Sequence, residues 1–267
     1  MTDIPALGGG TSLEFNGPLS AARADRLAGE LAARGPATVV DLGCGWGELL
    51  LRVLAAAPGA RGVGFDTHGP DLVRGRANAA SRGLADRVTF VDASASEHDT
   101  TADVLVNIGA YQAFGDIDEA LRALRRLVNP GGRVLFGAEF WERPPPPGRL
   151  AKMWPGATLA DCDDLPGLVD RTIAAGFRPL RIETVTPDEW AEFESGLAAD
   201  CEEWLLSHPD HPGAADLRSR LDDQRTTWLH GHRGLLGFAY LTLGPVLRTR
   251  VSLPHQQQPP SNPIPRR

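Results

Sequence analysis

The sequence predicts an α/β fold, a doubly wound and mostly parallel sheet of seven strands with helices on both faces. Two observations predict this fold. Short apolar runs typical of strands alternate with helical patterns along most of the chain, which is the signature of βαβ units. The first apolar run leads into a glycine-rich loop that opens a helix. With 267 residues, 42% of them hydrophobic, the chain can form one such domain carrying an insertion.

The elements are expected in a regular order. A lead-in helix is predicted at about 19–33, where Ser20 can cap its start. Strands are predicted at residues 37–41, 62–65, 88–91, 104–107, 133–138, 180–185 and 236–243. Helices are predicted between them at residues 48–57, 71–82, 117–128 and 165–175. The residues Asn129-Pro-Gly-Gly132 predict a turn before the fifth strand.

A helical insertion is predicted at about 186–233, between strands six and seven. Its first helix begins near Thr186 and ends near Leu206, and a second helix follows the His-Pro-rich break at 208–213. The insertion belongs to a single domain expected over residues 1–253. Residues 254–267 contain five prolines and three consecutive glutamines, so a disordered tail is expected there.

Composition disfavours several classes of partner. The formal net charge is -7, whereas binding to a phosphate backbone needs clustered Lys and Arg, so we expect no nucleic-acid partner. No run approaches the roughly 18 apolar residues of a membrane span, and the first ten residues lack the pattern of a signal peptide. We therefore expect no membrane partner and a cytoplasmic location. The three cysteines are widely spaced, and His230 and His232 lack further ligands nearby, so no metal site is expected.

The strongest local signal is the run Val39-Val-Asp-Leu-Gly-Cys-Gly-Trp-Gly47, an apolar strand followed by G-x-G-x-G. Glycine lets the backbone turn with positive φ and approach a ligand closely, and the helix start that follows offers free N–H groups. In a doubly wound sheet this loop lies where ligands bind. The alternative is a tight turn without a ligand. The spacing differs from the G-x-G-x-x-G of dinucleotide-binding proteins, and an acid, Asp41, precedes the first glycine.

Two further acids end the next two strands. Asp66 follows Asp41 by about 25 residues, where a carboxylate can accept hydrogen bonds from both hydroxyls of a ribose. Asp92 ends the third strand. Each acid alone could serve as a turn or helix cap. Three acids at consecutive strand ends, in register with a glycine loop, favour a shared nucleotide-like ligand.

These motifs resemble the class I S-adenosylmethionine (SAM)-dependent methyltransferases over about residues 37–140. V-V-D-L-G-C-G-W-G-E is similar to their first motif, G-V-G-F-D to the ribose-binding strand and F-V-D-A to the adenine-side strand, and the likeness continues through N-P-G-G-R-V-L-F. The resemblance implies SAM as cofactor, S-adenosylhomocysteine (SAH) as product, and an antiparallel last strand. The cofactor-binding residues that it implies are Asp41, Gly43, Cys44, Gly45, Gly47, Asp66, Thr67, Asp92, Ala93 and Asn107.

The fourth strand departs from the pattern of many relatives, which have Asp where this chain has Asn107. The residues that follow, I-G-A-Y, differ from the N/D-P-P-Y/F signature of base-methylating enzymes. The resemblance therefore favours a small-molecule acceptor over a nucleic acid. The runs I-G-A-Y-Q-A-F-G and E-F-W-E-R-P-P-P resemble a bacterial subgroup with varied small-molecule acceptors.

Candidate acceptor-side residues follow strands four and five. Tyr111 and Glu139 are the predicted catalytic residues, with Glu139 as a general base or, alternatively, a capping or salt-bridging acid. Tyr111 either orients the acceptor or packs on SAM. The predicted acceptor pocket adds Phe15, Gln112, Trp141 and His232. In this fold the insertion lies over the acceptor side, where its aromatic residues can form core, a lid or a homodimer contact.

The predicted function is SAM-dependent methyl transfer to an O, N or C nucleophile of a small molecule, in secondary metabolism. The main alternative is a SAM-binding regulatory protein or inactive partner. An NAD-linked oxidoreductase is disfavoured by the loop spacing and by the lack of a Tyr-x-x-x-Lys pair, since Lys152 is the only lysine.

Overall fold

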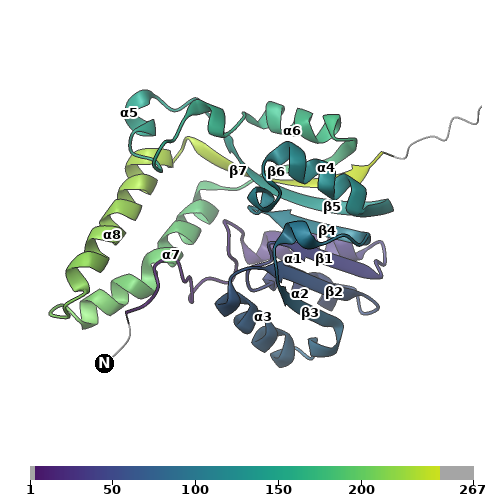
Figure 1. The fold of residues 1–267 in the computed structure, drawn as a ribbon, viewed down its shortest axis with the longest axis horizontal. Helices are drawn as coiled ribbons and strands as arrows, with labels where there is room; N and C mark the ends of the chain where they lie inside the picture. The colour runs from purple at the N-terminus through teal and green to yellow at the C-terminus, as the bar shows by residue number, and fades with distance from the viewer. Residues whose placement is uncertain (1–3, 247–267) are drawn as a thin grey trace, which may run out of the picture.

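The structure, a computed structural model, describes residues 4–246 (Figure 1). The predicted tail at 254–267 and the predicted domain limit at 253 lie outside this range. One sheet holds the strands in the order β3-β2-β1-β4-β5-β7-β6, and β7 is antiparallel to both of its neighbours. The strands are β1 (Thr38–Leu42), β2 (Arg61–Asp66), β3 (Val88–Asp92), β4 (Ala102–Ile108), β5 (Val128–Trp141), β6 (Phe177–Thr184) and β7 (Leu236–Pro245). The predicted mostly parallel, seven-stranded sheet is confirmed.

Helices cover both faces of the sheet, as Figure 1 shows. Alternate residues of a strand point to opposite faces, so Val39 packs with α1 and α2 while Val40 packs with α4 and α6. The helices on the first face are α1 (Ala21–Ala32), α2 (Glu48–Ala56) and α3 (Gly69–Ser81), and those on the second are α4 (Ile117–Leu127) and α6 (Leu165–Ala174). The lead-in helix is capped by Ser20, as predicted.

The insertion between β6 and β7 forms a helical hairpin that projects from the sheet (Figure 1). Its helices are α7 (Pro187–Ser207) and α8 (Ala214–Thr226), and a π-helical turn, Thr227–His232, leads back to β7. The Thr186 hydroxyl and the Glu189 carboxylate close a capping box at the start of α7. A small core of its own joins the two helices, made by Cys201, Trp204, Leu205, Ala214, Leu217 and Leu221.

The residues predicted as a turn at 129–132 lie inside β5. Pairing with β4 passes from Ala102↔Val128 to Val104↔Arg133, so the extra β5 residues form a bulge. Gly131 takes a φ of 81°, and the Asn129 amide donates to Asp103 at 2.8 Å. Turn-forming residues here bend a strand instead of interrupting it. The short helix α5 (Pro147–Leu150), within the connection from β5 to α6, was not predicted.

No helix within residues 4–246 is long and apolar enough to span a membrane.

Candidate active site

Two cavities share residues at the carboxyl edge of the sheet. The central cavity has a volume of about 360 Å³, and the side cavity has about 320 Å³. Gly43, Asp66 and Ala110 line both, so the two cavities adjoin at the glycine loop. The other residues of the central cavity are Phe15, Asn16, Gly17, Pro18, Leu19, Asp41, Cys44, Gly45, Trp46, Gly47, Glu48, Leu49, Ile108, Gly109, Glu139, Trp190, Phe193, Phe238 and Tyr240. The side cavity adds Phe65, Thr67, Ala93, Ser94, Ala95, Gln112 and Ala113.

The glycine loop turns in a way that only glycine accommodates easily. Gly43, Gly45 and Gly47 have φ values of 87°, 53° and 67°. A Cβ at Gly43 would overlap the Cβ of Ala110, and one at Gly47 would lie 2.5 Å from the Phe90 ring. The loop therefore presents bare backbone to the cavities, a cradle that side chains would fill.

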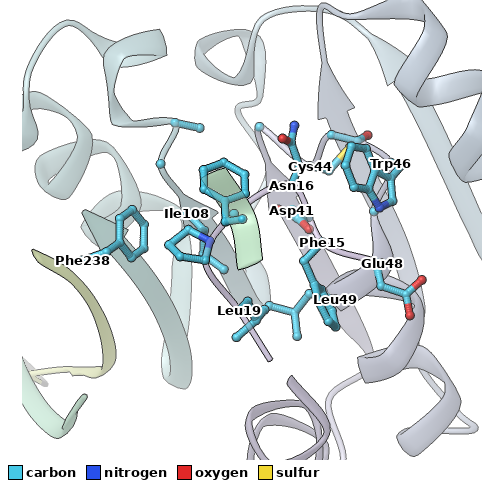
Figure 2. A pocket seen from close by; sticks show the side chains of 18 of the residues that line it. Phe15, Asn16, Leu19, Asp41, Cys44, Trp46, Glu48, Leu49, Ile108 and Phe238 are labelled. Carbon is cyan, nitrogen blue, oxygen red and sulfur yellow. The ribbon is translucent and has the colours of Figure 1, made fainter. Parts of the chain in front are cut away.

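The two acids beside the loop have different surroundings. Asp41 is only 4% exposed, and burial together with the nearby Asp66 raises its pKa to about 8. Asp66 accepts hydrogen bonds from the backbone N–H of Gly45 at 2.7 Å and of His68 at 2.9 Å. A carboxylate has about four acceptor sites, so Asp66 can hold the loop and still accept from two ribose hydroxyls. Figure 2 shows Phe15 and Asn16, from the segment before α1, close to Asp41 and Cys44.

Most of the predicted cofactor residues line these cavities, with two exceptions. Thr67 and Ala93 line the side cavity, and Gln112, predicted for the acceptor pocket, lines that cavity too. Asp92 is exposed and lines neither cavity. Asn107 is fully buried and lines neither, because its amide donates to the Leu42 carbonyl at 2.8 Å and so joins β4 to β1. The backbone after it, at 108–110, lines the central cavity instead.

Glu139 brings a carboxylate to the central cavity from β5. Its Oε2 is buried and has no hydrogen-bond partner among residues 4–246. Burial raises the pKa of this carboxyl, while its own backbone N–H and the Tyr111 side chain act in the opposite direction. Burial, and then the proximity of Glu139, raises the pKa of the half-buried Tyr111 hydroxyl. Tyr111 thus lies beside Glu139 at the cavity wall and is not a lining residue of either cavity.

Two residues predicted for the acceptor pocket lie elsewhere. Trp141 is buried, donates from Nε1 to the Leu159 carbonyl at 3.0 Å, and stacks on Trp154 with ring centroids 6.2 Å apart. Its side chain points into packing under the β5–α6 connection because that connection folds over the end of the strand. His232 is buried with Nε2 3.1 Å from the Glu194 carboxylate, and it lines a third cavity. Neither residue lines the central cavity.

Several aromatic residues of the central cavity were missed from the sequence. Trp190 and Phe193 come from α7, and Phe238 and Tyr240 come from β7. The aromatic residues of the insertion were expected to form core, a lid or a homodimer contact, and the structure places Trp190 and Phe193 at the cavity. Nothing in the pattern of the uniformly buried β7 marks which residues face the site. Trp46, between two glycines of the loop, donates to the Glu14 carbonyl at 2.8 Å and so fixes the segment before α1.

Within residues 4–246 no group of three or more His, Cys, Asp and Glu side chains could hold a metal ion. The polar groups that line the cavities instead suit a ligand with an amino group and hydroxyls: a buried acid, a strand-end acid and a bare loop. These are the groups that the amino acid and ribose parts of SAM require.

Comparison with known proteins agrees with this geometry. The model of a methyltransferase domain family matches residues 40–134. A demethylmenaquinone methyltransferase of Thermus thermophilus is 37% identical over 115 residues, covering 43% of this chain and 50% of the relative. The 27-O-demethylrifamycin SV methyltransferase of Amycolatopsis mediterranei is 32% identical over 127 residues, covering 46% of each chain. This chain thus spans about half the length of these curated relatives.

Similarity to a solved structure extends over almost the whole chain. A SAM-dependent methyltransferase from Geobacter sulfurreducens, in complex with SAH, superposes with a TM-score of 0.80 at 27% identity, covering 92% of this chain and 100% of that one. The glycine loop and the acids in register with it lie within the matched family region. Residues 40–134 therefore match a methyltransferase domain family, and almost the whole chain shares the fold of a SAM-dependent methyltransferase.

Proposed function

We propose that this chain transfers the methyl group of SAM to an O, N or C nucleophile of a small molecule. The observation that carries this proposal is the Glu139 carboxylate, whose Oε2 has no hydrogen-bond partner within residues 4–246 and which lines the same cavity as the glycine loop. Glu139 as proton acceptor and the site of the methyl donor would then lie within the same central cavity. A charge of -7 and relatives named for demethylmenaquinone and 27-O-demethylrifamycin SV support a small-molecule acceptor.

The two cavities divide the cofactor between them. Asp41 would bind the amino group of its methionine part, and the backbone at Gly43 and Gly45 would lie against that part. Asp66 would accept from the ribose hydroxyls. The side cavity, with Thr67 and Ala93 among its residues, would hold the adenine. When bound, SAM supplies a methyl group on a positively charged sulfur, which departs as the neutral thioether of SAH.

Glu139 would take the proton that the acceptor loses on methylation. An acceptor X–H becomes X–CH₃, the bond between sulfur and the methyl carbon breaks, and the proton goes to the carboxylate. Because burial raises the Glu139 pKa, its anion is a stronger base than an exposed carboxylate. Tyr111, whose side chain acts to lower the pKa of Glu139, would be a positioning residue for that carboxyl. Alignment of the acceptor with sulfur and methyl carbon supplies the rest of the acceleration.

The test pairs cofactor binding with methyl transfer. Calorimetry should detect SAH binding and no NAD binding, and a panel of phenols, amines, carboxylic acids and carbon acids is screened with methyl-labelled SAM. For any acceptor found, Glu139→Gln should lower kcat by about 10²- to 10⁴-fold and leave SAH affinity within about twofold. Glu203→Gln, on the exposed surface of α7, is the control. An unchanged kcat in Glu139→Gln would refute the base.

The same screen distinguishes a methyltransferase from the alternative, a SAM-binding protein that transfers no methyl group. If SAH binds and no acceptor on a broad panel is methylated, a SAM-binding regulatory protein or inactive partner is the better description. A role in secondary metabolism, a cytoplasmic location and a homodimer stay predictions.

A further inference from the structure

A third cavity lies next to the central one, under the insertion. This cap cavity has a volume of about 420 Å³, within the usual range for small-molecule sites. It is formed where the start of the β5–α6 connection, the first turns of α7 and the π-helical turn meet. Its residues are Glu142, Arg149, Pro187, Trp190, Trp228, Leu229, His232, Arg233, Gly234 and Leu236.

Trp190 is the wall between the central and cap cavities, since it lines both. Its Nε1 donates to the Leu236 carbonyl at 3.1 Å, which ties the ring to β7. The ring lies 5.8 Å from His232 on the cap side and 6.4 Å from Phe238 on the central side, measured between ring centroids. The central and cap cavities are therefore separated by one aromatic ring.

The cap cavity combines an apolar wall with arginines that have no acidic partner. Trp228, Leu229 and Leu236 supply the apolar wall. Arg149 and Arg233 form no ion pair within residues 4–246, so neither positive charge is neutralised by a paired carboxylate of the described residues.

The charges at this cavity sum to an excess of positive charge. Arg149 donates from Nε to the Gly231 carbonyl and from Nη2 to the Arg233 carbonyl, each at 2.8 Å, which fixes the guanidinium and leaves Nη1 for a ligand. Glu142 is the only carboxylate among the residues of the cavity, and it balances one of the two arginines. His232, when protonated, is already paired with Glu194.

We propose that the cap cavity is the subsite for the part of the acceptor that does not react, an aromatic or apolar group that ends in an anion such as a carboxylate. This inference rests on the function proposed above. The apolar group would lie against Trp190 and Trp228, and Arg149 and Arg233 would bind the anion through charged hydrogen bonds. The acceptor class is then an amphipathic organic acid whose nucleophile reaches Glu139.

The test uses two probes that share a naphthyl ring and differ in whether the side chain ends in a carboxylate or in a neutral alcohol. The ligands are 2-naphthylacetate and the neutral alcohol 2-(2-naphthyl)ethanol, titrated into the full chain saturated with SAH. The acid should bind roughly tenfold more tightly than the alcohol, and Arg233→Gln should remove that difference. Arg143→Gln is the matched control, because Arg143 is also exposed and donates to the neighbouring Gly234 carbonyl but does not line the cavity. Equal binding of the two probes, or an equal effect of both variants, would overturn the proposal.

A second pair of variants locates the site. Leu229→Trp should fill the cavity and weaken both probes at least about tenfold. Leu206→Trp, on the 78% exposed Leu206 of α7, should weaken neither. Retained binding in Leu229→Trp would place the probes elsewhere. SAH affinity, measured separately, distinguishes the two failures. If SAH does not bind, the proposed function is wrong, whereas if SAH binds and the probes show no charge preference, only the subsite is wrong.

Discussion

The proposed cofactor edge at β1 to β4 and the cap formed by α7, α8 and the π-helical turn would bind their ligands by different means. At the cofactor edge, the groups proposed to contact the cofactor are backbone turns and strand-end acids. They come from short stretches of contiguous sequence. At the cap, Trp190 of α7 meets Arg149 of α5 and Leu236 of β7, which are about 40 residues or more away in sequence. In the proposed function, cofactor recognition would therefore be encoded locally, whereas acceptor recognition would depend on how separate elements pack.

The largest effect should come from the backbone cradle. In Gly43→Ala the new methyl group overlaps Ala110 at a φ of 87°, so the loop must move out of the cofactor site. SAH affinity, measured by calorimetry, should fall about 100-fold or more.

Gly35→Ala separates this effect from backbone strain alone. Gly35 also has a positive φ, 63°, but a Cβ there meets nothing within 4 Å. Its SAH affinity should stay within about twofold of the parent value. Similar losses in the two variants would mean that strain, and not the cradle, weakens binding.

The next largest effect should be a loss of stability in the cap when Glu189 is replaced, with little change in SAH binding at the cofactor edge. Glu189 is buried, and although burial raises its pKa, hydrogen bonds from Arg23, Thr186 and Ser20 lower the value to about 2. Glu189→Gln should reduce the free energy of unfolding by about 2 kcal/mol at pH 7 and speed hydrogen exchange in α7. SAH affinity should hold within about threefold.

The pH dependence of this effect has a definite sign. Because the folded-state pKa of Glu189 lies below the ordinary 4.5, its stabilisation is complete above that pH and is lost as pH falls toward 2. The difference in free energy of unfolding between the parent and Glu189→Gln, measured by urea unfolding, should therefore become smaller as pH falls below 4.5. Glu202→Gln, which loses an exposed pair with Arg225 on the same helix, should cost less than about 1 kcal/mol. An equal loss in both variants would contradict a special role for Glu189.

Replacing Asp41 should change SAH affinity by about tenfold. Its pKa of about 8 means that the carboxyl is mostly protonated at pH 7 in the absence of ligand. Binding the ammonium group of SAH favours the ionised form, so parent affinity should rise between pH 6 and pH 8 as protons are released. Asp41→Asn should bind roughly tenfold more weakly at pH 8 and release no proton. Calorimetry in buffers of different ionisation enthalpy counts the protons.

The exposed Asp86→Asn is the control for that series and should retain the proton release. A parent protein that binds SAH without releasing protons at pH 7 would show that Asp41 does not face the amino group.

The sequence predicted the sheet well, and it predicted many of the residues that line the cavities at its carboxyl edge, because both depend on local patterns. Strand ends, the glycine loop and the order of helices follow from hydrophobic periodicity and turn residues. The bulge at 129–132 could not be predicted, because pairing with β4 decides whether such residues end a strand. Asn107 shows the same limit at the site. Its position at a strand end suggested a ligand contact, but its orientation depends on the Leu42 carbonyl of the adjacent strand.

Trp141 offers the smallest and most discriminating test, since sequence position predicts an acceptor contact and packing places it in a core. Trp141→Phe removes the hydrogen bond to Leu159 and part of the ring, which should cost about 1 kcal/mol in urea unfolding. Trp154→Phe, which loses a hydrogen bond to Asp161 from the ring stacked on Trp141, is the matched control and should cost less because that bond is exposed. Acceptor KM and SAH affinity should be unchanged in both. A raised acceptor KM in Trp141→Phe with unchanged stability would mean that Trp141 contacts the acceptor and is not only a core residue. The acceptor site would then include the end of β5.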